Sequence, residues 1–180
     1  EELSAAIRAS LEVLSVAPRG IMVPLFAAPY RAVIGNVDHS IHLVGPTGAG
    51  KSVLAALIQQ HFGAGMDGRH LPAGWSSTGN ALEMLAFLAK DAVMTVDDFV
   101  PAGSTQDRAK LNREAERLLR GQGNQAGRQR MTADAALRHG KPPRGLILST
   151  GEDCPAGQSL RARLLILEVD PADIRWDRVS

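Results

Sequence analysis

The sequence predicts an α/β domain in which helices cover both faces of a parallel sheet, and two observations support this. Short apolar runs of strand length alternate along the chain with longer runs that show helical spacing. A glycine-rich segment, GPTGAGKS at 45–52, stands between one such strand and one such helix. Strands that are separated by helices are typical of parallel sheets with helices on the two faces.

The expected helices are identified by apolar spacing and by start signals. Thr78 is placed to cap one of them, and Ser104 with Asp107 fits the capping pattern of another. The helices are expected over 2–15, 21–34, 53–62, 79–90 and 105–120, with one further helical turn at 159–163.

The expected strands are apolar runs, two of which end in polar residues. HSIHLVG runs directly into the glycine-rich segment, and AVMTVDDF ends in two acids. The strands are expected over 39–45, 69–76, 92–99, 144–150 and 164–169. Residues 1–34 are then an N-terminal helical segment, and 35–180 form the core of the domain.

Composition limits the classes of protein to which the chain can belong. Its 180 residues suit one well-buried core, and a formal charge of +1 means that any affinity for nucleic acid must come from local clustering. A single cysteine, Cys154, excludes an internal disulfide framework and is typical of a reducing cytoplasm. No apolar run approaches the roughly 20 residues that span a bilayer, so we expect no membrane partner.

The segment GPTGAGKS has the residues that a triphosphate requires. Glycines let the backbone N–H groups close around phosphates, and the N-terminus of the following helix adds its dipole. Lys51 supplies a positive charge for the β- and γ-phosphates, and Ser52 a hydroxyl ligand for Mg²⁺. The alternative is an ordinary glycine-rich turn, but the strand–loop–helix context favours an ATP site. Its expected residues are Gly45, Pro46, Thr47, Gly48, Ala49, Gly50, Lys51, Ser52 and Val53.

Polar residues at two other strand ends are candidates for the metal and for the attacking water. Asp97 is expected to act with Ser52 at Mg²⁺, and Asp98 to polarise water. Alternatively, both acids are turn residues at the end of a strand. The neighbouring glycine-rich segment favours the metal and water roles over this alternative. Thr150 points at the γ-phosphate if its strand lies between the other two; a simple capping role is equally compatible with the sequence.

Two arginines stand before the last predicted strand. Arg161 and Arg163 suit γ-phosphate stabilisation, because a guanidinium is always charged and binds bidentately. Supplied by a neighbouring subunit, such a residue acts as an arginine finger. A solvated pair is the alternative, and the sequence does not decide between them.

In their order and spacing, these motifs resemble those of AAA+ ATPases. GPTGAGKS, VMTVDDF, LILSTGED and SLRARLLILEV are similar to Walker A, Walker B, sensor 1 and arginine-finger elements. The stretches before sensor 1 and around GWSSTGNALEMLAFLAKDAV resemble superfamily-three helicases and primase–helicases of phages, plasmids and integrative elements. The resemblance covers roughly residues 35–170 and implies a three-layer P-loop fold with strand order 5-1-4-3-2.

Two departures from that family stand out. Superfamily-three helicases usually have Asn at the sensor-1 position, where this chain has Thr150. The sequence also ends soon after the last predicted strand, so we expect no helical lid within 35–180. Either the chain is a fragment, or the N-terminal helices take the role of the lid.

A basic segment supplies the remaining functional hypothesis. Six basic residues lie between Arg120 and Arg144, opposed only by Asp134, and glycines are frequent there. Phosphate-backbone contacts without base stacking suit this composition, and a solvated loop is the alternative. The candidate nucleic-acid contacts are Arg128, Arg130, Arg138 and Lys141.

Two classes of function follow from the sequence. In the first, the chain is a Mg²⁺-dependent ATPase that moves along or unwinds single- or double-stranded DNA. It would then self-associate as a ring, expected to be a hexamer, in the replication of a mobile element. In the second, it is an AAA+ loader or switch that remodels a protein partner. Small-molecule phosphoryl transfer is weaker, because no acceptor site is identifiable.

Overall fold

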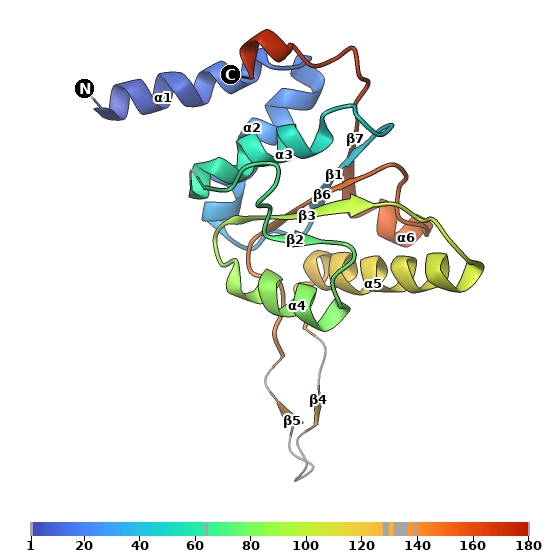
Figure 1. The fold of residues 1–180 in the computed structure, drawn as a ribbon. Coiled ribbons are helices and arrows are strands. Elements are labelled where there is room, and N and C mark those ends of the chain that lie inside the picture. The colour runs from blue at the N-terminus through green and yellow to red at the C-terminus, as the bar shows by residue number, and fades with distance from the viewer. Residues whose placement is uncertain (1, 64, 128–129, 132–136, 139, 180) are drawn as a thin grey trace.

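The computed structural model describes residues 2–63, 65–127, 130–131, 137–138 and 140–179 (Figure 1). Its α-helices are α1 (Glu2–Glu12), α2 (Arg19–Ile34), α3 (Lys51–Gln59), α4 (Gly79–Leu88), α5 (Thr105–Gly123) and α6 (Gln158–Arg161). The 3-10 turns are η1 (Val13–Ser15), η2 (Gln60–Phe62) and η3 (Trp176–Arg178). The strands are β1 (Ser40–Val44), β2 (Ala73–Gly74), β3 (Val93–Phe99), β4 (Arg130–Met131), β5 (Leu137–Arg138), β6 (Leu146–Gly151) and β7 (Leu164–Glu168).

Five strands form one parallel sheet in the order β2-β3-β6-β1-β7. Counted 1 to 5 in chain order and read from the β7 edge, this is 5-1-4-3-2, the order that the resemblance implies. The strand β1, which leads into the glycine-rich loop, is therefore flanked by β6 and β7. The strand β6 in turn separates β1 from β3, which confirms the condition set for Thr150.

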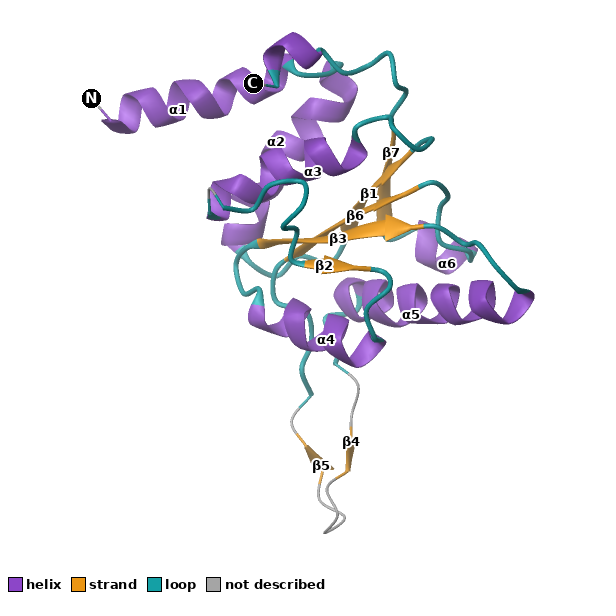
Figure 2. Cartoon of the chain, in the orientation of Figure 1, coloured by secondary structure: helices purple, strands orange, loops and turns teal. Residues whose placement is uncertain are grey.

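Helices cover both faces of this sheet and give the chain three layers (Figure 2). One hydrophobic cluster joins α2 and α3 to one face of the sheet. A second cluster joins α4, α5 and α6 to the opposite face. The predicted three-layer α/β fold is therefore confirmed.

Alternation along the central strands decides which polar groups meet. In β6, Leu146 and Leu148 belong to the α2/α3 cluster, whereas Ile147 belongs to the other. Successive side chains of a strand point to opposite faces, so Thr150 lies on the α3 side and Ser149 on the α5 side. The same period in β3 brings Asp97 to the α3 side, next to the loop that follows β1.

Several predicted boundaries are corrected by the structure. The first helix ends at Glu12 and continues as η1, and the strand expected over 69–76 is only the two residues of β2. By contrast, Thr78 and the Ser104–Asp107 capping box form as predicted. The helix α2 also forms, although Pro24 and Pro29 lie inside it.

The segment 121–143, which holds most of the basic segment, contains two kinds of structure. Its first three residues complete α5, and β4 pairs antiparallel with β5. In Figure 1 these two strands lie well away from the sheet, beyond α4 and α5.

The two N-terminal helices differ in their packing. The helix α2 contributes Met22 and Leu25 to the core, whereas α1 has no buried residue. The boundary drawn at residue 35 stays a prediction. Among the described residues, none of the helices combines the length and apolarity needed to cross a membrane.

Candidate functional site

The segment between β1 and α3 is a tight loop whose backbone requires glycine at two positions. Gly48 and Gly50 have φ of 81° and 80°, in the left-handed region that other residues rarely occupy. Gly45 is constrained differently, because a Cβ there would collide with the carbonyl of Val169 on the chain after β7. The loop leads directly into α3, whose first turn has N–H groups without intrahelical partners.

Lys51 lies at the first position of α3 and is buried, with 8% of its surface exposed. Its Nζ donates to the carbonyls of Gly45, at 2.7 Å, and Pro46, at 2.8 Å. The sequence predicts a helix that begins at residue 53, with Lys51 in the loop and outside the core; the structure instead buries Lys51 in the first turn of α3. By bonding to two carbonyls of the loop, the ammonium group holds the loop closed. It lies where the phosphates are expected to bind.

Three predicted residues come together beside this loop. Ser52 Oγ donates to Asp97 Oδ1 at 2.8 Å, and Thr150 Oγ1 donates to the same oxygen at 2.5 Å. The three residues come from α3, β3 and β6, and they meet because β3 and β6 end, and α3 begins, at one edge of the sheet. A carboxylate next to a hydroxyl is a pair of hard oxygen donors, which is the ligand type that Mg²⁺ prefers. The residues present therefore fit a magnesium ion.

Asp98 is positioned by an irregularity in β3. The register with β6 shifts between Val96 and Phe99, and Asp98 takes a φ of 69°. Its backbone N–H donates to Thr150 Oγ1 at 3.1 Å, while its side chain is exposed. The bulge turns the second acid away from Asp97, so that the two carboxylates occupy different environments. The Thr150 hydroxyl, which donates to one acid and accepts from the next, fixes this arrangement.

Sequence reasoning assigned no role to Glu152, which follows β6. Its carboxylate accepts a hydrogen bond from the Thr47 hydroxyl of the glycine-rich loop. The segment LILSTGED carries this residue directly after the candidate sensor, and the strand order brings the end of β6 beside the loop. The position of Glu152 directly after the candidate sensor strand was therefore visible in the sequence. Its contact with the glycine-rich loop follows only when the order of the strands is known.

A buried series of hydrogen bonds on the α5 side of the sheet was also not predicted from the sequence. Trp75 Nε1 donates to Ser149 Oγ at 2.9 Å, and His42 lies 3.0 Å from Ser149 Oγ and 2.9 Å from the Asp153 carbonyl. Burial lowers the pKa of His42, opposed by the hydrogen bond to Asp153. In the neutral ring, Nε2 donates to Asp153 and Nδ1 accepts from Ser149. These hydrogen bonds fix the segment that carries Glu152.

The two candidate finger arginines have different surroundings. Arg163 donates to Ser159 O at 2.6 Å and to Asn124 Oδ1 at 3.0 Å, so it joins α6 to the end of α5 within its own chain. Arg161 is exposed and lies near Cys154. Burial raises the pKa of the Cys154 thiol, and the charge of Arg161 opposes the rise. Of the two arginines, Arg161 is therefore the better placed to reach another molecule.

The candidate nucleic-acid contacts are distributed over the β4–β5 hairpin and its base. Arg130 of β4 is paired in register with Arg138 of β5, whereas Arg128 lies outside the described residues. Lys141 does not extend from the hairpin: its Nζ lies 3.5 Å from Met84 Sδ and 5.7 Å from the centre of the Phe87 ring.

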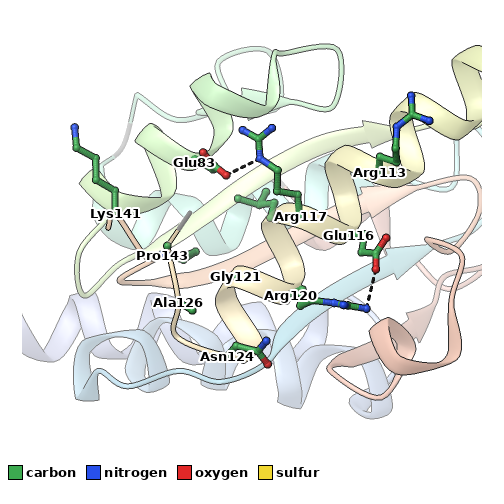
Figure 3. Close-up of a pocket in the computed structure, with 12 residues that line it drawn as sticks. Glu83, Arg113, Glu116, Arg117, Arg120, Gly121, Asn124, Ala126, Lys141 and Pro143 are labelled. Carbon is green, nitrogen blue, oxygen red and sulfur yellow. Dashed lines mark hydrogen bonds and ion pairs between the residues drawn. The ribbon is translucent and has the colours of Figure 1, made fainter. Parts of the chain in front are cut away.

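A cavity of about 500 Å³ lies where α4, α5 and the hairpin base meet (Figure 3). It contains none of the residues 45–53, so it is separate from the site described above. Its charged lining residues are Arg113, Arg117, Arg120, Lys141, Glu83 and Glu116. Arg117 pairs with Glu83 at 2.5 Å and Arg120 with Glu116 at 2.7 Å. The surplus of positive charge continues the basic character of the hairpin onto α5.

Comparison with protein families identifies the chain. The family DUF927, a domain of unknown function, matches residues 14–141. The chain belongs to the DUF927 family. The match includes the glycine-rich loop, β3 and the hairpin strands, and it ends before β6. No curated protein matches this DUF927 chain.

Solved structures show the fold of this DUF927 domain. The active helicase Cch of SCCmec type IV is similar at 16% sequence identity and a TM-score of 0.51, over 95% of this chain and 30% of that one. This likeness shows a shared P-loop ATPase fold, and the chain spans 30% of the helicase's length.

Two further structures resemble the chain more weakly. A JCV helicase crystallised with a thiazolopyridine acetamide is 13% identical, with a TM-score of 0.47, over 91% of this chain and 44% of that one. NtrX from Brucella abortus in complex with ATP is 16% identical, with a TM-score of 0.41, over 82% of this chain and 36% of that one.

Proposed function

We propose that this DUF927 domain binds ATP with Mg²⁺, hydrolyses it, and uses the energy to move along DNA as part of an oligomeric ring. The observation that supports hydrolysis is the meeting of Ser52, Asp97 and Thr150 beside a loop closed by a buried lysine. Ser52 and Asp97 would hold Mg²⁺, which when bound neutralises charge on the phosphates. Asp98, exposed at the same edge, would orient the attacking water.

The hairpin register supports nucleic acid as the partner. The register places two arginines of the sequence opposite each other, Arg130 in β4 and Arg138 in β5. Two cationic residues at one level of a hairpin suit an anionic partner, and a phosphate backbone is such a partner. The basic lining of the cavity on α5 has the same charge.

The hairpin hypothesis is tested with the double variant Arg130→Ala/Arg138→Ala. We expect basal ATPase activity to persist and stimulation by single-stranded DNA to be lost, because these residues lie outside the loop at 45–53. The slope of log affinity against log salt should become less steep by about 1.4, at about 0.7 for each phosphate contact. The measurements are ATPase rate with and without DNA, and DNA binding over a salt series.

The matched control is Arg8→Ala/Arg69→Ala, which removes the same charge from exposed positions away from the hairpin. An unchanged salt slope in the hairpin variant, or an equal change in the control, would contradict the DNA-tracking hypothesis. The protein-remodelling alternative would then lead. It has its own support, since Leu3, Ile7 and Leu11 are exposed along α1.

A second prediction concerns assembly. We propose that Arg161 acts on the nucleotide of a neighbouring subunit, whereas Arg163 supports its own chain. Arg161→Ala and Lys51→Ala subunits should each be inactive alone and should regain activity when mixed, because some interfaces then have an intact arginine facing an intact loop. An Arg163→Ala subunit should instead show a lowered melting temperature.

ATPase rate at varied mixing ratios measures this complementation, with mass measurement to confirm that the subunits mix. Mixed oligomers without recovered activity would argue against a finger. Activity in the mixture identifies a finger only if Arg161→Ala is inactive by itself, because a subunit in which Arg161 is merely a surface residue would also give active mixtures.

A further inference from the structure

The chain after β7 returns over the glycine-rich loop and is fixed at both ends. The N–H of Val169 donates to the carbonyl of Val44 at 2.8 Å, and the N–H of Arg175 donates to the carbonyl of Val16 at 2.8 Å. Between these bonds the chain makes a turn, in which the Asp173 carboxylate accepts from the N–H of Asp170 and the Asp170 carboxylate accepts from the N–H of Ala172. The segment 169–176 is therefore held against the residues that the phosphates would approach.

Two apolar side chains of this segment lie on the loop itself. A Cβ added at Gly50 would collide with Ile174 and would stand 3.0 Å from Cη2 of Trp176. Ile174 is 6% exposed and belongs to the core cluster of α2 and α3. Trp176 touches the loop with the edge of its ring, yet 52% of its surface is exposed. Core packing therefore accounts for Ile174 and does not account for Trp176.

The second tryptophan of the chain shows the usual way in which this side chain is used. Trp75 is 4% exposed, donates to Ser149 and packs edge-on against Phe99 at 5.5 Å between ring centres. Among the described residues, the indole N–H of Trp176 has no hydrogen-bond partner and its ring has no aromatic neighbour, although its backbone carbonyl accepts from the N–H of Val179. A large apolar ring left in water beside a ligand loop is a surface that a ligand can cover.

We propose that Trp176 is the platform on which the base of the nucleotide stacks. The inference rests on the proposed function, because it requires the triphosphate to lie in the loop at 45–52. A base is joined to those phosphates by a single ribose, so it must lie close to the loop. The exposed ring beside Gly50 offers an apolar face at that distance. Every nucleobase has a π-face, so the platform takes nucleoside triphosphates without selecting between ATP and GTP.

The test compares ATP with inorganic tripolyphosphate, which has the phosphates but no base. In Trp176→Ala, ATP affinity should fall about tenfold, as expected for the loss of one base–aromatic stack, while tripolyphosphate affinity stays unchanged. Trp176→Phe should restore most of the ATP affinity. Calorimetric titration of the full chain measures both ligands. The intrinsic fluorescence of Trp176 should also respond to ATP and not to tripolyphosphate.

Tyr30→Ala is the matched control, since Tyr30 is an aromatic residue of equal exposure, 53%, on α2. It should leave both affinities unchanged. If Trp176→Ala weakens both ligands equally, the ring only shapes the loop, and the platform is refuted. If it weakens neither, the base lies elsewhere. A wild-type chain that binds neither ligand would refute the phosphate site itself, which is a different result from a loss confined to ATP.

Discussion

Replacing Lys51 with alanine is expected to abolish measurable ATP binding, and hydrolysis with it. The Lys51 ammonium is the cation inside the loop, where it lies 2.7 Å and 2.8 Å from two loop carbonyls. Its removal leaves the segment 45–52 without a positively charged side chain to offset a triphosphate that carries several negative charges. Calorimetric titration with Mg²⁺-ATP should show the loss directly, and ATPase rate should fall to background.

The same variant is expected to stay folded. Alanine is the best helix former, so α3 keeps its first turn. The hydrogen bonds to Gly45 and Pro46 are lost, but so is the cost of burying an ammonium, and the two effects oppose each other. We expect the free energy of unfolding to change by only about 1 kcal/mol. Because Lys51 is 8% exposed, this must be measured by thermal or urea unfolding.

Lys90→Ala removes the same charge from an exposed side chain that pairs with Asp91, away from the loop. This control should bind ATP as the wild type does. A folded Lys51→Ala chain that binds ATP with unchanged affinity would remove the basis for every other nucleotide prediction made here, including the base platform at Trp176.

The sequence was sufficient for the features that depend on local chemistry. Glycines at 48 and 50 are required by positive φ, and the polar residues Ser104 and Asp107 cap α5 through contacts three residues apart. The apolar runs that became β1, β3 and β6 are buried on both faces, as central strands of a parallel sheet are. Such features involve neighbours in sequence, so a single chain reveals them.

Features that depend on long-range pairing were not accessible in the same way. The bulge that turns the Asp98 side chain away from Asp97 forms because β3 pairs with β6, which lies some 50 residues later in the chain. The bond between His42 and Ser149 joins residues 107 positions apart. In the sequence, β1 and β6 are both apolar runs. Neither run shows which polar residue of the partner strand will lie opposite it. The place of Trp176 on the loop has the same origin, since it depends on the course of the chain after β7.

The Asp97–Asp98 pair allows the division of roles in the site to be tested. Asp98→Asn should leave ATP affinity unchanged and lower the rate of hydrolysis by about 10²–10⁴-fold, the usual contribution of a group that positions or deprotonates water. Asparagine also tolerates the left-handed backbone at φ 69°, so the substitution removes the charge without straining the bulge. Single-turnover hydrolysis and equilibrium binding measure the two quantities separately.

Asp97→Asn should behave differently, because Asp97 Oδ1 accepts from both Ser52 and Thr150 and its charge is what would hold Mg²⁺. We expect the Mg²⁺ concentration for half-maximal activity to rise about 10–100-fold, with partial recovery at high Mg²⁺. Asp91→Asn is the control, since Asp91 is another aspartate with positive φ, at 58°, beside β3 and outside the site. If both variants lose activity equally and neither recovers with Mg²⁺, the two acids act as one unit. The separation that the bulge creates would then have no part in the chemistry.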